Sequence, residues 1–267
     1  MRTHLCGVLR KEDVGTKVRI KSTDFNRIEA AITESLEASL QRMGRDQVDI
    51  FHLHNAITTN GGDESIAART VLEQVVPAFD KLRQQGKLRF LGITAVGDTA
   101  ALHQVIDARV FHSAQVSYNM LNPSAGAALP AGYPAQDYGK MFDHTQSAGV
   151  GVVGIRVLAG GALSGAPERH RIASPPPDPI GSAHSYDADM QRARRLSPLV
   201  QQGYAGSLPE AAVRFAISHP AMGTILVGMA TPAEFEQALA AVNKGPLPKA
   251  ALDNLATIQR GFVGEAR

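Results

Sequence analysis

The chain has 267 residues, of which 44% are hydrophobic and 19% are charged, as in an ordinary globular protein. This composition excludes a disordered, collagen-like or coiled-coil chain, and the length suits one large domain or two small ones. The 27 basic and 25 acidic residues leave a net charge of +2 without a long basic run, which disfavours a nucleic-acid interface.

Short apolar runs rich in β-branched residues alternate with amphipathic helical segments along the whole chain. In the first helical segment apolar residues recur every three or four positions, with Thr23 or Asp24 as the expected N-cap and Gly44 as the expected end. The predicted strands cover residues 14–20, 48–54, 90–96, 114–120, 150–157 and 224–229. The predicted helices cover residues 25–43, 66–82, 100–108, 136–146, 187–200, 208–218, 233–242 and 250–261.

Two proline-containing segments interrupt this alternation. Pro77 lies inside the second predicted helix and should kink or divide it, because proline cannot donate a backbone hydrogen bond. Residues 158–186 include three consecutive prolines and are predicted to form a long surface loop.

The order of strands and helices predicts the fold class. Strands joined by helical crossovers are parallel, and strands that are apolar on both faces fit a sheet covered by helices. We therefore predict an α/β fold, either a barrel or an open doubly wound sheet. No GxGxxG sequence follows an early strand, which lowers the Rossmann alternative. No linker divides the chain, so residues 1–267 are predicted to form a single domain.

Targeting and redox signals are sparse. The first twenty residues lack the apolar core of a signal peptide, and no apolar run reaches the roughly 20 residues of a membrane span. Cys6 is the only cysteine, which excludes an internal disulfide and a cysteine-rich metal site and fits a reducing compartment. We expect a soluble cytoplasmic protein without a membrane partner.

Candidate functional residues lie where the predicted strands end, since parallel α/β folds gather their chemistry at that edge. Lys17 either faces a charged partner inside the fold or extends to water. His54 shares a strand face with His52, so the two could bind a metal, although no later strand ends in Asp or His. Alternatively, a neutral His54 polarises a carbonyl or moves a proton, or it is a half-buried structural histidine. The strand ends also select Asn55, Thr94, Tyr118, Asn119, Arg156, Gly228 and Thr231.

Two glycine-containing loops are candidate phosphate sites. The sequence GGALSG at residues 160–165 follows the fifth predicted strand, where glycines allow the backbone to approach a ligand. After the last strand, Gly228 leads to Thr231 as a natural N-cap and Pro232 at the first helical position. Each signal is weak alone, because many strand–turn–helix junctions contain these residues.

In combination, these segments resemble the aldo-keto reductase family. The resemblance extends from residue 14 to residue 242. It rests on GTKV at 15–18, SLEASLQRMG at 35–44, VDIFHLH at 48–54, GKLRFLGI at 86–93, AQVSYNML at 114–121, LAGGALSG at 158–165 and residues 224–228 with the helix after them. The resemblance implies an eight-stranded (β/α) barrel of the TIM type that binds NADP, or alternatively NAD. It further implies hydride transfer to a small aldehyde, ketone or sugar without a metal.

The resemblance also assigns site residues. The family's catalytic lysine falls on Lys17 and its histidine on His54; the lysine would lower the pKa of a catalytic tyrosine, and the histidine would orient the carbonyl. The cofactor contacts fall on Thr94, Gln115, Arg156, Leu158, Gly160, Gly165, Gly228, Thr231, Glu234 and Gln237. The chain departs from the family at Thr94-Ala95, where a Ser-Asn pair is usual, at Arg156, which replaces an aromatic residue, and at Ala238, which replaces an asparagine. No arginine stands at the usual position for the 2′-phosphate.

The largest departure precedes Lys17. The family's catalytic aspartate and tyrosine come before the lysine, yet no tyrosine precedes Lys17 here, and Asp13 is not the family's aspartate. Successive predicted strands start about 42 residues apart, so two further strand–helix repeats would need about 84 residues, whereas 13 precede the first predicted strand. We therefore expect an incomplete barrel with six of eight repeats and impaired carbonyl reduction.

Three functions remain open from the sequence. The first is an aldo-keto reductase whose start lies upstream of Met1 or has been lost. The second is a non-catalytic nucleotide-binding relic that keeps Gln115 and the two glycine loops. The third is a metal-dependent barrel hydrolase that uses His52 and His54. The oligomeric state and the individual substrate are not predicted.

Overall fold

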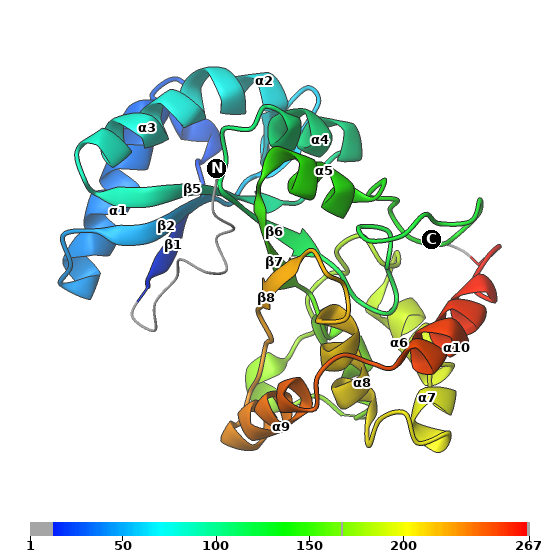
Figure 1. Ribbon diagram of the computed structural model, residues 1–267. Coiled ribbons are helices and arrows are strands. Elements are labelled where there is room, and N and C mark those ends of the chain that lie inside the picture. The colour runs from blue at the N-terminus through cyan, green and yellow to red at the C-terminus, as the bar shows by residue number, and fades with distance from the viewer. Residues whose placement is uncertain (1–12, 167, 266–267) are drawn as a thin grey trace. The chain divides into compact units, whose positions relative to one another are not determined.

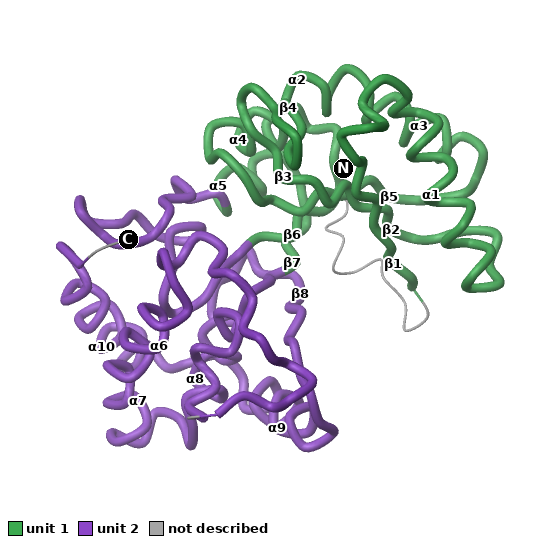
Figure 2. The backbone as a smooth tube through the Cα atoms, turned by 180° about the vertical axis from the view of Figure 1, so that it is seen from behind, with its two compact units in different colours: residues 1–116, 142–153 green, residues 117–141, 154–267 purple. Residues whose placement is uncertain are grey.

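The computed structural model describes residues 13–166 and 168–265, and Cys6 lies outside them. The chain forms two compact units (Figures 1 and 2). Unit 1 comprises residues 1–116 and 142–153, and unit 2 comprises residues 117–141 and 154–267. No helix within the described ranges is long and apolar enough to cross a bilayer.

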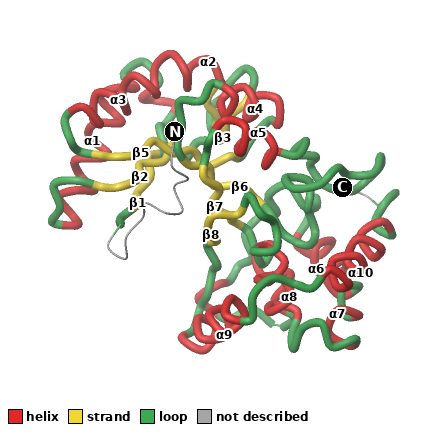
Figure 3. Tube along the Cα trace, viewed as in Figure 1, coloured by secondary structure: helices red, strands yellow, loops and turns green. Residues whose placement is uncertain are grey.

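Strands and helices alternate along unit 1 (Figure 3), which confirms the α/β prediction. The strands follow one another in the order β1-β2-β5-β6-β7-β8. The ladders β1–β2, β2–β5 and β5–β6 are all parallel. Their bounds are β1 Gly15–Val18, β2 Val48–Leu53, β5 Leu88–Ala95, β6 Ser113–Ser117, β7 Gly151–Ile155 and β8 Met222–Ile225.

Helices of unit 1 pack against its strands, with α1 on β1 and α3 on β5. The apolar stripe of α1 buries Ile32 and Leu36 fully, and Gly44 ends the helix at a φ of 61°. The bounds are α1 Ile28–Met43, α2 Ala68–Thr70, α3 Val76–Gln84, α4 Thr99–Asp107 and α5 Met141–Ala148.

The expected start of α1 was wrong. A 3-10 turn at Ser22–Asp24 comes first, and the helix begins at Ile28 with Arg27 as a cap residue that makes no side-chain cap bond. Asp24 accepts a hydrogen bond from Arg27 Nε at 2.8 Å instead of capping the helix. This local ion pair therefore replaces the cap that the sequence predicts.

Pro77 divides its helix, as expected. It occupies the first turn of α3, where its missing N–H costs nothing, and the π-helical segment Val71–Val75 precedes it. The predicted helix start at Ile66 is wrong, because Ile66 lies in the short strand β4 (Ser65–Ala67), which pairs with β3 (Ala56–Thr58). Three-residue strands are too short to give a periodic sequence signal.

Unit 2 is built mainly from helices around a small apolar core. Val157, Val213, Ala216 and Ala241 are buried together where α8 and α9 meet. Thr231 caps α9 and Pro232 follows it, as the sequence predicts. The bounds are α6 Tyr186–Arg194, α7 Pro198–Gln201, α8 Leu208–Ala216, α9 Pro232–Asn243 and α10 Lys249–Arg260.

The strands are shorter than predicted at their carboxyl ends. β6 ends at Ser117, so Tyr118 and Asn119 lie beyond it, and β8 ends at Ile225, so Gly228 lies in the segment that leads to α9. The predicted loop at 158–186 contains two 3-10 segments, Ala159–Ser164 and Arg171–Ala173. The candidate residues after β6 and β8 are consequently held by irregular backbone.

Candidate functional site

Unit 1 carries a row of polar side chains where neighbouring strands end. Register pairs Thr94 of β5 with Gln115 of β6, and His54 directly follows β2. His54 Nδ1 lies 2.8 Å from Thr94 Oγ1, and Thr94 Oγ1 donates to Gln115 Oε1 at 3.2 Å. Strand pairing thus brings together three residues that are 61 positions apart at the extremes.

A second row lies one pleat earlier on the same strands. Register pairs His52 with Gly92, and Gly92 with Ser113. The His52 ring lies against Gly92, where an added Cβ would be 2.3 Å from its Cδ2 atom, and its Nε2 is 3.4 Å from Ser113 Oγ. Glycine is required here because the imidazole fills the space of a side chain.

Both histidines are biased toward the neutral form. Burial first, and then the cation of Lys17, lower the pKa of His52 to about 4. Burial, followed by Lys17 and Arg19, also lowers the pKa of the half-buried His54. Near neutral pH the two imidazoles therefore act as hydrogen-bonding groups without a charge.

Lys17 extends to water from β1. The strand register places Lys17 beside His52, and its side chain is exposed. Of the two alternatives from the sequence, Lys17 therefore extends to water and is not enclosed within unit 1. Two residues after this strand ends, the backbone is held by Asn55, which accepts from Ile20 N and donates to Ile20 O, both at 2.8 Å. Asn55 is 1% exposed, so this strand-end residue has a structural role.

The metal hypothesis rests on His52 and His54. Across the residues that the structure describes, no three His, Cys, Asp or Glu side chains form a group that could hold a metal ion. His52 Nε2 lies 3.4 Å from Ser113 Oγ and His54 Nδ1 lies 2.8 Å from Thr94 Oγ1, so one nitrogen of each ring has a partner in the protein.

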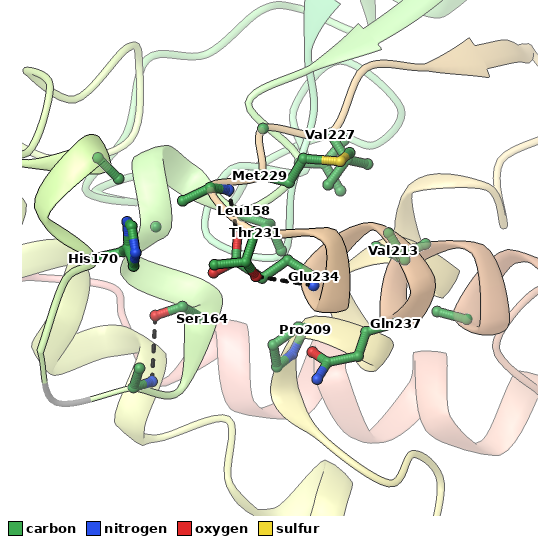
Figure 4. Close-up of a pocket in the computed structure, with 18 of the residues that line it drawn as sticks. Leu158, Ser164, His170, Pro209, Val213, Val227, Met229, Thr231, Glu234 and Gln237 are labelled. Atoms are coloured by element: carbon green, nitrogen blue, oxygen red, sulfur yellow. Dashed lines mark hydrogen bonds between the residues drawn. The ribbon is translucent and has the colours of Figure 1, made fainter.

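Unit 2 contains a cavity of about 820 Å³, within the range of small-molecule sites (Figure 4). It lies among the loop after β7, the segment after β8 and the start of α9. Of the residues that the sequence assigns to cofactor binding, Arg156, Leu158, Gly160, Gly228, Thr231, Glu234 and Gln237 line this cavity. Gly165 does not; it ends the 3-10 segment Ala159–Ser164 at a φ of 71°.

The loop after β7 has a tightly wound backbone. Gly160 and Gly161 have φ values of 67° and 103°, a region that residues with a Cβ rarely adopt. The Leu158 carbonyl accepts from Gly161 N at 2.8 Å and from Leu163 N at 3.1 Å. These turns bring backbone close to the cavity without side chains in between.

Arg169 holds this loop in place. Its Nη1 donates to Gly160 O at 2.7 Å and to Tyr186 Oη at 3.0 Å, and its Nε and Nη2 donate to Ala173 O. The guanidinium also lies 5.1 Å above the Tyr186 ring. No sequence pattern points to Arg169, because a single arginine in a long loop has nothing to distinguish it.

Arg156 follows β7 in a left-handed conformation, with a φ of 58°. Its carbonyl accepts from Asn119 Nδ2 at 3.0 Å, and Nη1 donates to Asp178 O at 3.4 Å. Burial lowers the pKa of its guanidinium, which stays charged near neutral pH. Among the residues that the structure describes, the other guanidinium donors of Arg156 make no hydrogen bond, unlike those of Arg169.

At the start of α9, side-chain oxygens accept hydrogen bonds from backbone N–H groups (Figure 4). Thr231 Oγ1 accepts from Glu234 N at 3.2 Å, while Glu234 Oε2 accepts from Ala230 N at 2.6 Å. The pair differs from a standard capping box, because the carboxylate accepts from the N–H of Ala230 and not from that of the cap residue Thr231. In contrast, a Cβ on Gly228 would meet nothing within 4 Å, so the cavity is open at that point.

Curated proteins with similar sequences are known. The chain is 25% identical over 236 residues to L-galactose dehydrogenase of Arabidopsis thaliana, covering 86% of this chain and 64% of that protein. It is 27% identical over 222 residues to L-glyceraldehyde 3-phosphate reductase of Escherichia coli O157:H7, covering 78% and 57%. The chain thus spans about three fifths of the length of these curated relatives.

Solved structures share the fold. Aldo-keto reductase AKR11C1 from Bacillus halodurans, in its holo and apo forms, is similar with a TM-score of 0.63 and 18% identity over 98% of this chain and 77% of that chain. At that identity the similarity establishes the fold, an α/β arrangement close to the barrels of these enzymes. The family model described as "Aldo/keto reductase family" matches residues 11–260. On this match, the chain belongs to the aldo/keto reductase family.

Proposed function

We propose that this protein is an oxidoreductase that transfers hydride between NADPH, or alternatively NADH, and a small aldehyde, ketone or sugar. The observation that carries the proposal is the bonded row His54–Thr94–Gln115 at the ends of adjacent parallel strands in a member of this family. When bound, the reduced nicotinamide supplies the hydride that adds to the carbonyl carbon, and a proton completes the alcohol.

In unit 1, His54 and Lys17 are the proposed catalytic residues. His54 is half-buried and neutral near pH 7, so it hydrogen-bonds a polar substrate atom without adding a charge. Lys17 supplies the nearby cation, which stabilises negative charge on a substrate or acid–base group. Thr94 and Gln115 are the proposed neighbours of the nicotinamide amide, and the Gln115 amide nitrogen is available as a donor because its oxygen receives the Thr94 proton.

In unit 2, the cavity suits the phosphates of a dinucleotide. Its volume is sufficient for a large ligand, the left-handed glycines expose backbone near it, and the Arg156 guanidinium provides a cation at its edge. We propose that Arg156, Leu158, Gly160, Gly228, Thr231, Glu234 and Gln237 hold the cofactor there. Gly165 is proposed only as the turn that ends this loop.

The substrate class follows from the relatives. Both curated relatives named above act, by their names, on small polyhydroxylated sugars or sugar phosphates. We propose a substrate of that kind, and a cytoplasmic location that fits a single cysteine in 267 residues.

A second candidate is a protein that binds the nucleotide without turnover. It is favoured by one observation: the cavity of unit 2 is lined by most of the residues assigned to the cofactor. Binding and turnover must therefore be measured separately.

The first test is fluorescence titration of the purified protein with NADPH and NADH, which measures binding. The second is an assay of NADPH and NADH oxidation with glyceraldehyde as the carbonyl substrate, which measures turnover. Gly228→Leu should fill the cavity and weaken cofactor binding at least tenfold with an unchanged melting temperature, since its Cβ meets nothing within 4 Å. Gly228→Ala is the matched control and should bind nearly as well as the parent. Binding without turnover would favour the second candidate, and the absence of any nucleotide binding would refute both.

A further inference from the structure

The hydrogen-bonded row in unit 1 fixes the direction of its own protons. A threonine hydroxyl has one hydrogen, and Thr94 donates that hydrogen to Gln115 Oε1 at 3.2 Å. Thr94 and Gln115 are 3% and 4% exposed, so water has little access to take either place. Toward His54, Thr94 Oγ1 can therefore only accept.

It follows that the hydrogen between His54 and Thr94 belongs to the imidazole. The 2.8 Å separation is then an Nδ1–H donor bond from His54 to Thr94 Oγ1. In a neutral imidazole one nitrogen carries the proton and the other a lone pair, so Nε2 is left as an acceptor. Within the described residues Nε2 makes no hydrogen bond, and the ring is half-buried, so this lone pair is available to a ligand.

We propose that Thr94 and Gln115 are positioning residues that hold His54 as the Nδ1–H tautomer, so that its Nε2 accepts a hydrogen bond from a ligand hydroxyl. The site in unit 1 then prefers the alcohol form of its ligand, because a carbonyl oxygen has no hydrogen to donate. Only the choice of ligand rests on the proposed function; the tautomer follows from the row itself.

This assignment also changes what Thr94 can do. Thr94 donates its single hydroxyl hydrogen to Gln115 and accepts a hydrogen bond from His54. It therefore has no hydrogen left to donate to a cofactor amide. Gln115 keeps its amide hydrogens, and any amide contact from this row must come from Gln115. The opposite row, in which Gln115 donates to Thr94 and Thr94 donates to His54, would leave Nε2 protonated.

The direct test is nitrogen NMR of the full chain without cofactor, near neutral pH. Two-bond correlations to the ring protons distinguish a protonated ring nitrogen from an unprotonated one. We expect His54 Nδ1 to be protonated and Nε2 to be unprotonated. An Nε2–H tautomer in the parent protein would overturn the proposal, and this readout needs no variant to fold.

Variants of Gln115 test the cause. Gln115→Glu offers only acceptor oxygens at neutral pH and should preserve the tautomer, whereas Gln115→Lys offers only donors and should reverse it. Thr94→Val removes the hydroxyl that links His54 to Gln115 and should abolish the preference of His54 for the Nδ1–H tautomer. Thr94→Ser keeps a hydroxyl and should keep that preference. A tautomer that is the same in all four variants would show that Thr94 and Gln115 do not set it.

The ligand preference is tested with cyclohexanol and cyclohexanone, which differ in hydroxyl against carbonyl. Cyclohexanol should shift the His54 Nε2 resonance in the parent and bind roughly tenfold more weakly to Thr94→Val, the loss of about one hydrogen bond. Cyclohexanone should leave Nε2 unshifted, and an equal shift by both would overturn the hydroxyl preference. Because no nucleotide is present, failure of the proposed redox function would leave these results unaffected.

Discussion

The two units build their candidate sites by different means. In unit 1 the polar side chains are aligned by strand register and bond directly to one another, from His54 to Thr94 to Gln115. In unit 2 the cavity is shaped by backbone: left-handed glycines, a helix start capped by Thr231 and a loop that Arg169 holds in place. The difference teaches that strand ends can be inferred from sequence periodicity, whereas loop closure depends on individual long-range contacts.

The largest expected effect concerns the buried histidine of unit 1. The pKa of His52 is about 4 in the folded protein and near 6.5 when unfolded, so the unfolded state binds the proton first as pH falls. Its contribution to stability is complete above pH about 6.5 and is lost as pH falls through about 4, which amounts to about 3 kcal/mol.

Urea unfolding of the parent and of His52→Gln at pH 7 and pH 4 measures this loss. The parent should lose more stability on acidification than the variant does. Equal losses in the two proteins would mean that His52 is not the titrating group.

The next effect tests how tightly the unit 1 rows are packed. Gly92→Ala forces a Cβ against the His52 ring, where the ideal separation would be 2.3 Å, and should lower the free energy of unfolding by about 2 kcal/mol. Gly228→Ala in unit 2 has open space and serves as the control. If Gly92→Ala and Gly228→Ala lowered the free energy of unfolding equally, the site in unit 1 would not be more tightly packed than the site in unit 2.

A smaller effect tests the loop of unit 2. Arg169→Ala removes the bonds to Gly160 O, Tyr186 Oη and Ala173 O, and should cost about 1 to 2 kcal/mol and speed amide exchange in residues 160–173. Arg169→Lys should rescue it only in part, because an ammonium cannot reproduce the guanidinium fork. Exposed Arg171 lies in the same loop, and Arg171→Ala is the control, with little change expected.

The smallest effect concerns the helix start beside the cavity. Thr231→Ala removes the side-chain acceptor of Glu234 N and should destabilise by about 1 kcal/mol, while Thr231→Ser retains the cap. Thermal unfolding of both variants measures this difference. If Thr231→Ser were as unstable as Thr231→Ala, the threonine methyl group rather than the cap would be responsible.

The sequence predicted much of the fold, for reasons that particular segments make clear. Every strand in the main sheet was anticipated, since runs such as 90–96 are mostly apolar and bounded by polar turns, and Gly44 and Thr231 gave correct helix signals. The strands β3 and β4 were missed because their stability comes from pairing with each other. The start of α1 was misplaced because Asp24 pairs with Arg27, a choice between two local bonds.

The candidate sites divide in the same way. Lys17, His54, Thr94 and Gln115 could be selected because strand ends are visible in the sequence, and Gly228 and Thr231 because turn and cap residues are distinctive. The sequence did not indicate that Thr94 links His54 to Gln115, which depends on the register of three strands. It also could not identify Arg169, whose partners are mostly backbone carbonyls.

The π-helical segment Val71–Val75 has a consequence for how this chain tolerates changes in length. A helix turns by about 100° per residue, so deleting one residue there would let an α-helix run straight into α3 while rotating everything before it by that angle. Val71 and Ala68 would leave their buried positions, and strand β4 would be drawn away from β3. The extra residue in this turn acts as a spacer that keeps the buried residues on both sides of it in register with the core.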